Sequence, residues 1–183
     1  MLQVIIPGKD FWDETAGDSG EFRTSKTETL QLEHSLVSLS RWESKWCKPF
    51  LTKDEKTLEE TIDYIRCMTV TQNVNPTTYL TIPVDVFAQV KDYIDSKQTA
   101  TWFAEDKTIS PNREVITSEL IYYWMIAQNI PIECQKWHLN RLLTLIRVCS
   151  VKNAPNKKQS RREMLAQRKA LNASRRARGS TKG

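Results

Sequence analysis

The spacing of hydrophobic residues changes along this chain, and each change predicts a different element. β-Branched residues dominate 2–6, which a Pro-Gly pair ends, so this segment is predicted to be a strand. A polar stretch follows at 10–20, and the Thr-rich segment 21–31 is predicted to return as a second strand. Residues 1–31 are therefore expected to form a small N-terminal β-hairpin that packs on the rest of the protein.

After this region, hydrophobic residues recur every three or four positions, which is the spacing of one helix face. Thr57 and Glu60 have the spacing of a capping box, and Pro83 fits the first turn of a helix. Either Thr117 or Ser118 can cap the next helix. The predicted helices cover residues 32–46, 57–68, 83–94, 117–127 and 134–149.

The last two predicted helices are separated only by a short turn with an asparagine and a proline, so we expect a helical hairpin at the centre of the core. Hydrophobic residues make up 39% of the chain, which also has six tryptophans, and this is enough for a compact core. The predicted fold class is mainly α. It comprises a compact helical core domain over 32–151, the small N-terminal β-hairpin region over 1–31, and a basic C-terminal tail over 152–183.

Charge divides the chain unequally. Residues 152–183 carry a formal charge of +10, whereas residues 1–151 carry −5. The tail is predicted to be either disordered or a solvated helix that becomes ordered on binding. It can act as a solubilising arm, bind nucleic acid by neutralising phosphates, or fold against an acidic protein. Its candidate binding residues are Arg161, Arg162, Arg168, Lys169, Arg175, Arg176 and Arg178.

The sequence lacks the patterns that are typical of catalytic sites. No GxSxG, GxGxxG or P-loop motif occurs, and the four cysteines lie among hydrophobic residues, which disfavours a reactive thiolate. Cys134 and His138 have the spacing of two metal ligands on a helix, but His34 and Cys67 would have to join them by folding. A core cysteine beside a hydrogen-bonded histidine is the favoured interpretation. We therefore expect a non-enzymatic protein without a metal or cofactor.

Nothing in the sequence predicts a secreted or membrane-bound protein. No hydrophobic run approaches the ~18 residues that a membrane-spanning helix needs, and the N-terminus lacks the pattern of a secretory signal. The four cysteines form no CxxC pair, which fits a reducing compartment. We therefore expect a cytoplasmic protein whose partners are macromolecules.

An aromatic and basic stretch at 41–50 is the main candidate surface. Two tryptophans lie one helical turn apart among basic residues, so this stretch can dock a hydrophobic helix of a partner or stack nucleic-acid bases. Alternatively, both tryptophans belong to the core, where large aromatic residues are usually mostly buried. The candidate partner-binding residues are Arg41, Trp42, Lys45, Trp46 and Phe50.

Several long stretches resemble proteins of long-tailed bacteriophages. They are LEHSLVSLSRWESKW at 32–46 with KPFL at 48–51, ITSELIYYWM at 116–125, ECQKWHLNRLL at 133–143 and RKALNASRRA at 168–177. Among such proteins, the chain is most similar to the tail assembly chaperones. In that family, a small helical protein coats the long tape-measure protein before the tail tube subunits polymerise around it.

The resemblance implies a non-enzymatic phage tail assembly chaperone in the host cell cytoplasm, with the tape-measure protein and the tail tube protein as partners. It implies no catalytic residues. Two other functions stay open. One is a structural protein of the virion, such as a head–tail connector or tail-completion protein, and the other is a nucleic-acid-binding protein that acts through the basic tail. An oligomer is compatible with each of them.

Overall fold

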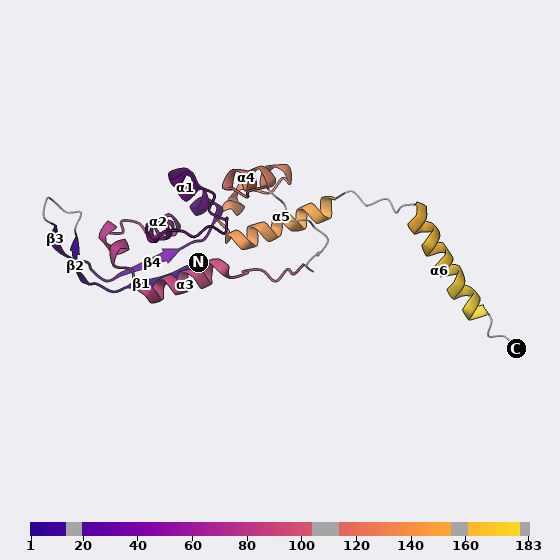
Figure 1. The fold of residues 1–183 in the computed structure, drawn as a ribbon, viewed down its shortest axis with the longest axis horizontal. Coiled ribbons are helices and arrows are strands. Elements are labelled where there is room, and N and C mark those ends of the chain that lie inside the picture. Colours follow the sequence, from indigo (N-terminus) through magenta and orange to yellow (C-terminus); the bar gives the residue numbers. More distant parts are fainter. Residues whose placement is uncertain (14–19, 104–113, 155–160, 180–183) are drawn as a thin grey trace. The chain divides into compact units, whose positions relative to one another are not determined.

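The chain forms two compact units, Met1–Ser150 and Val151–Gly183, which are described separately. The structure is a computed structural model, and it describes residues 1–13, 20–103, 114–154 and 161–179. Helices predominate in it and a β-hairpin lies at the N-terminus (Figure 1), which confirms the predicted mainly α fold class.

The N-terminal hairpin consists of two antiparallel strand pairs. They are β1 (Leu2–Ile6) with β4 (Glu28–Leu32), and β2 (Asp10–Asp13) with β3 (Glu21–Thr24). Ile6 lies opposite Glu28, and Asp10 lies opposite Thr24. The same register therefore continues from the first pair into the second, and the predicted hairpin is confirmed.

The hairpin is longer than the sequence predicts. The segment 10–20, for which only a polar stretch is predicted, begins with strand β2 because the Trp12 and Phe22 rings contact each other across the strands, with centroids 6.4 Å apart. At the junction of the two pairs, the Ser25 N–H donates to the Lys9 carbonyl (3.0 Å), and the Lys9 N–H donates to Ser25 Oγ (2.9 Å). These bonds keep the strands together where the regular ladder is interrupted.

Alternation along the strands decides which side chains reach the core. Val4, Ile6, Leu30 and Leu32 are buried, whereas Ile5 is exposed. Successive side chains of a strand point to opposite faces. One face of the hairpin therefore packs against the helices, and the other is open to solvent.

The helices that follow the hairpin are α1 (Leu36–Trp46), α2 (Leu58–Met68), η1 (Pro76–Thr81), α3 (Val84–Asp95), α4 (Ser118–Ala127), η2 (Ile132–Lys136) and α5 (Leu139–Asn153), where η denotes a 3₁₀-helix. Every predicted helix has a counterpart, but the first begins later than predicted. Ser35 caps α1 by accepting a hydrogen bond from the Ser38 N–H, whereas Leu32, the last residue of β4, still pairs with Leu2 of β1. Backbone pairing thus takes priority over the helical spacing at Leu32.

The segment before α5 is not α-helical, which corrects the predicted helix 134–149. Cys134 lies in η2, and His138 forms an isolated antiparallel bridge with Ser35. The backbone of His138 is therefore paired like a strand, and Cys134 and His138 do not share the helix face that their spacing predicts. The Leu139 N–H then donates to the His34 carbonyl (2.8 Å), which anchors the start of α5.

Two predicted helix starts are confirmed in atomic detail. The Glu60 N–H donates to Thr57 Oγ1 (3.2 Å), and the Thr57 N–H donates to Glu60 Oε2 (2.8 Å), so α2 begins with a complete capping box. Thr117, one of two alternatives, is the N-cap of α4. Such caps depend on a few neighbouring residues, and this is why the sequence predicts them.

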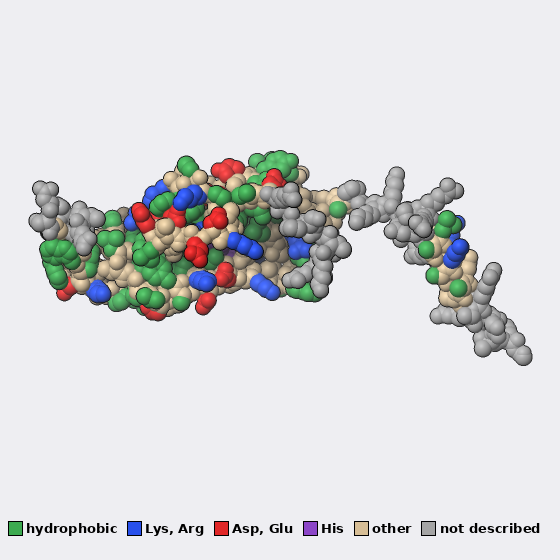
Figure 2. All heavy atoms as spheres, viewed as in Figure 1, with side chains coloured by type: hydrophobic (Ala, Val, Ile, Leu, Met, Phe, Trp, Pro, Cys, Tyr) green, Lys and Arg blue, Asp and Glu red, His purple; other side chains and the backbone are tan. Residues whose placement is uncertain are grey.

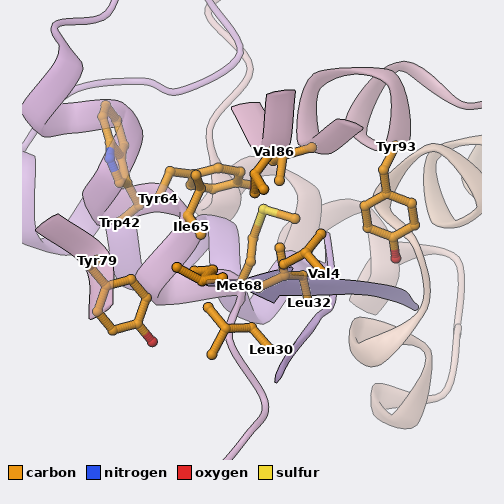
Figure 3. Close-up of a cluster of buried hydrophobic side chains, with 12 residues drawn as sticks. Val4, Leu30, Leu32, Trp42, Tyr64, Ile65, Met68, Tyr79, Val86 and Tyr93 are labelled. Atoms are coloured by element: carbon orange, nitrogen blue, oxygen red, sulfur yellow. The ribbon is translucent and has the colours of Figure 1, made fainter. Parts of the chain in front are cut away.

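The first unit has two clusters of buried hydrophobic side chains. The first cluster, shown in Figure 3, joins the hairpin to α1, α2, η1 and α3. Its members are Val4, Ile6, Leu30, Leu32, Trp42, Tyr64, Ile65, Met68, Tyr79, Val86, Val90 and Tyr93. The second cluster joins α1, α4, η2 and α5, and its members are Leu36, Leu39, Ile121, Met125, Ile130, Cys134, Leu139, Leu142 and Ile146. The predicted helical hairpin α4–α5 therefore belongs to one of two clusters and is not the centre of a single core.

The second unit contains α6 (Arg161–Gly179). Residues 161–179 of the tail are thus helical, and ordering of the tail on binding stays a prediction. The side chains of Arg168, Lys169 and Arg175 are exposed, as expected for a solvated helix.

Candidate functional site

Trp42, one of the five candidate partner-binding residues, is a core residue. It is 1% exposed, and its Nε1–H donates a hydrogen bond to the Glu60 carbonyl (2.9 Å). Its ring meets the rings of Phe50 and Tyr64 edge-on, with centroids 5.1 and 6.5 Å away. The core interpretation of Trp42 is confirmed, and this side chain offers no outer surface to a partner.

Lys45 and Trp46 both bind one carboxylate of α2. Lys45 Nζ donates to Asp63 Oδ1, and Trp46 Nε1–H donates to Asp63 Oδ2 (2.9 Å). Burial alone would raise the pKa of Asp63, but the hydrogen bonds from Lys45 and Trp46 outweigh burial and lower the pKa. The ionised carboxylate therefore neutralises the positive charge that the sequence places beside Trp46.

Lys48 is paired in the same way. Its Nζ donates to Glu60 Oε1, and this hydrogen bond, together with the one from the Thr57 N–H, lowers the pKa of Glu60. Arg41 is exposed. The predicted basic surface is therefore mostly a set of ion pairs, and Figure 2 shows basic and acidic side chains interspersed over this unit.

Glu43 is a structural residue that the sequence does not reveal. It is buried, its Oε1 accepts from the Phe50 N–H (2.8 Å), and its Oε2 accepts from the Ser118 N–H (2.7 Å). A carboxylate at the start of α4 also interacts favourably with the helix dipole. Glu43 thus ties the segment after α1 to the beginning of α4, although its position between Trp42 and Ser44 resembles an ordinary surface charge.

Phe50, the fifth candidate residue, lines a groove between α2 and α3. The groove has a volume of ≈ 610 Å³. Its lining residues are Phe50, Lys53, Asp54, Lys56, Thr61, Tyr64, Ile65, Phe87, Val90, Lys91 and Ile94. This volume lies in the ordinary range of ligand-binding clefts, about 300 to 1,000 Å³. We refer to this feature as the α2–α3 groove.

The floor of the α2–α3 groove is hydrophobic and rigid. Phe50 stacks on Tyr64 with centroids 3.8 Å apart and an interplanar angle of 25°. Phe50, Phe87 and Ile94 are partly buried and pack against the first cluster. Each of them therefore presents hydrophobic surface to the groove while the core fixes its position. Phe87 and Ile94 are seven residues apart, and this spacing on one helix face is the signal by which the sequence indicates the groove.

A pair of histidines lies where the two clusters meet. His34 is buried, its Nδ1 is 2.6 Å from the Tyr64 hydroxyl, and its ring centroid is 5.0 Å from that of His138. His138 Nε2 is 3.0 Å from the Tyr93 carbonyl oxygen. Burial, assisted by the neighbouring His138, lowers the pKa of His34 to about 3. Both rings therefore act as neutral, hydrogen-bonding parts of the interior.

The candidate residues of the basic tail occupy regular positions on α6. Basic pairs stand at 161–162, 168–169 and 175–176, seven residues apart. Seven residues correspond to about two turns, so the backbone positions of the pairs recur every ~10.5 Å along the helix. The tail differs in this respect from the first unit, where the lysines beside Trp46 are paired with carboxylates.

Within the described residues, no group of three or more His, Cys, Asp or Glu side chains is arranged to hold a metal ion. No helix in that part of the chain combines the length and hydrophobicity needed to cross a membrane. Comparisons of the chain with protein-family models, with curated proteins and with solved structures find no match.

Proposed function

We propose that this chain is a non-enzymatic tail assembly chaperone of a long-tailed bacteriophage, which binds the tape-measure protein in the host cell cytoplasm before the tail tube polymerises. The observation that carries the proposal is the α2–α3 groove, a hydrophobic cleft of ≈ 610 Å³ on a small helical unit. The resemblance of residues 32–46, 48–51, 116–125, 133–143 and 168–177 to proteins of long-tailed bacteriophages, most of all to the tail assembly chaperones, supports it as well.

The α2–α3 groove has the chemistry that a helix-binding chaperone needs. A tape-measure protein is a long chain with hydrophobic helix faces, which aggregate unless another surface covers them. An amphipathic helix fits a hydrophobic groove by inserting side chains spaced three, four or seven residues apart. Phe50, Phe87 and Ile94 provide partly exposed hydrophobic contacts that the core holds in place.

Co-expression with the tape-measure protein tests the proposal. The wild-type chain is expected to co-purify with the tape-measure protein and to increase the soluble fraction of that protein several-fold. Phe87→Asp places a charge in the groove and should abolish both effects. Leu58→Asp is the matched control, because Leu58 is an exposed hydrophobic residue at the start of α2 that does not line the groove. Circular dichroism of each variant verifies that the helices are retained.

The chaperone proposal fails if the wild-type chain neither co-purifies with the tape-measure protein nor raises its solubility. A structural role in the virion makes the opposite prediction about mature particles. Mass spectrometry of purified particles should find a structural protein in stoichiometric amounts, whereas a chaperone should be absent or sub-stoichiometric.

Binding of nucleic acid by α6 is the second candidate function, and the basic pairs at heptad spacing favour it. Phosphate contacts of this kind are insensitive to base sequence and weaken steeply with salt. Changing Arg168, Lys169 and Arg175 together to Gln should lower the affinity for duplex DNA and reduce the slope of affinity against salt concentration. An unchanged salt slope would exclude α6 as the binding element.

A further inference from the structure

We infer that the α2–α3 groove selects amphipathic helices whose hydrophobic face is bordered by carboxylates. The inference rests on the proposed function and specifies which helices of the partner are bound. It arises from the positions of three lysines around the hydrophobic floor of the groove.

Lysines from two separate elements line the α2–α3 groove. Lys91 is on α3, whereas Lys53 and Lys56 belong to the connection between α1 and α2. Asp54 is the acidic residue among the lining residues, so the lining carries a net positive charge. A helix lying on the hydrophobic floor would therefore meet ammonium groups from two separate elements.

These lysines differ from those beside Trp46 because no carboxylate among the described residues pairs with them. Lys45 is paired with Asp63 and Lys48 with Glu60, whereas no ion pair involves Lys53, Lys56 or Lys91 within the described residues. The first unit as a whole is acidic. Unpaired lysines gathered around one groove of an acidic unit therefore indicate an anionic ligand at this place.

Lys56 shows how the rim and the floor are connected. Its Nζ lies 4.7 Å from the centroid of the Phe50 ring and 3.5 Å from the carbonyl oxygens of Thr52 and Asp54. These carbonyl contacts are at the limit of hydrogen-bond distance and leave the ammonium free to bind a stronger acceptor. A carboxylate that approaches the edge of the groove can be bound by Lys56 while the adjacent side chain contacts Phe50.

The distribution of the lysines favours a helix over a small hydrophobic acid. A fatty acid has one carboxylate and needs one cation, whereas three lysines from two elements match several carboxylates spaced along a chain. The basic tail of this protein carries like charges and is a poor ligand for the same rim. An amphipathic helix with Glu or Asp on both flanks of its hydrophobic face can contact the hydrophobic floor and bind the lysines at the same time.

Two synthetic helical peptides test the inference on the full-length chain. Both carry the same leucine face, and they differ only in having Glu or Lys at the flanking positions. Fluorescence anisotropy at low salt is expected to show about tenfold tighter binding of the Glu peptide, and the difference should shrink as salt increases. The double variant Lys56→Glu, Lys91→Glu should reverse the preference. Lys26→Glu is the matched control, because this exposed lysine of the hairpin does not line the groove.

The outcomes separate this inference from the proposed function. Equal binding of the two peptides, or an unchanged preference in the double variant, overturns the inference and leaves the chaperone function in place. If the chain does not bind the tape-measure protein but still prefers the Glu peptide, the proposed function is overturned and the inference holds. The inference is also overturned if dodecanoate displaces the Glu peptide and binds as tightly as that peptide. It is likewise overturned if a second copy of the chain occupies the groove.

Discussion

The two hydrophobic clusters of the first unit are built from different side chains. The first cluster combines strands with helices and includes Trp42, Tyr64, Tyr79 and Tyr93. The second cluster is formed by helices, and its buried members among the described residues are aliphatic side chains, a methionine and a cysteine. α1 contributes to both clusters, and Phe50 packs against both.

This difference determines how each cluster tolerates change. Buried aromatic side chains with polar atoms need specific partners, as Trp42 finds in the Glu60 carbonyl and Tyr64 finds in His34. Aliphatic side chains can repack as long as volume is conserved. We therefore expect the first cluster to depend on exact geometry and the second to depend mainly on hydrophobic volume.

Replacement of Trp42 is expected to have the largest effect. Trp42→Ala should lower the free energy of unfolding by about 4 kcal/mol, because it removes a large buried ring and the hydrogen bond from the indole to the Glu60 carbonyl. Leu142→Ala in the second cluster should cost about 3 kcal/mol. Urea unfolding followed by circular dichroism measures both values. A larger loss for Leu142→Ala would contradict the distinction between the clusters.

Acid should act where the clusters meet. The lowered pKa of His34, about 3 against the ordinary 6.5, means that the unfolded chain binds a proton between these pH values and the folded chain does not. The contribution of His34 to the free energy of unfolding is therefore complete above pH 6.5. It decreases as the pH falls below this value, by about 3 kcal/mol at pH 4. Urea unfolding at pH 7 and pH 4 measures the loss. His34→Gln should show a clearly smaller loss, and an equal loss would assign the effect to other groups.

The carboxylate that ties α1 to α4 should have an intermediate effect. Glu43→Gln keeps the shape of the side chain but removes its charge and one of its two acceptor oxygens, so we expect a loss of about 2 kcal/mol in the free energy of unfolding. Glu59→Gln, at an exposed position of α2, is the control and should change stability little. Thermal unfolding of the two variants distinguishes them. A cost no larger than that of Glu59→Gln would mean that the link is dispensable.

The cap of α2 should have the smallest effect. Thr57→Ala removes the acceptor for the Glu60 N–H and should cost about 1 kcal/mol. Because the cap is local, the loss in the free energy of unfolding at neutral pH should be similar at low and at high salt concentration. A loss above that of Glu43→Gln, measured in the same urea titrations, would show that the cap also supports the first cluster.

Local features of this fold follow from the sequence, and contacts between distant segments do not. The capping box of Thr57 and Glu60 is predictable because two residues, three positions apart, determine it. The first residues of α1 and α5 are not predictable in this way, because Leu32 pairs with Leu2 of β1 and His138 pairs with Ser35. Helical spacing continues through both residues, but long-range backbone pairing decides their conformation.

The same limit applies to the candidate site. The stretch 41–50 reads as basic because the carboxylates that neutralise it, Asp63 and Glu60, stand on another helix. Glu43 escapes notice because its partner Ser118 is 75 residues away in the sequence. Phe50, one of the candidates, lines the groove, but the groove also requires α3. The sequence indicates a hydrophobic face on this helix, and only the fold shows that this face lies beside Phe50.

The unbroken register of the hairpin links its far end to the core. Trp12 and Phe22 are 54% and 69% exposed, and they pair with each other at even-numbered positions, as Val4 and Leu30 do in the first strand pair. Insertion of a single residue into each connecting segment, 7–9 and 25–27, would keep the strands paired and turn this aromatic pair to the opposite face. The length of two short connections thus decides the face of the hairpin on which Trp12 and Phe22 stand.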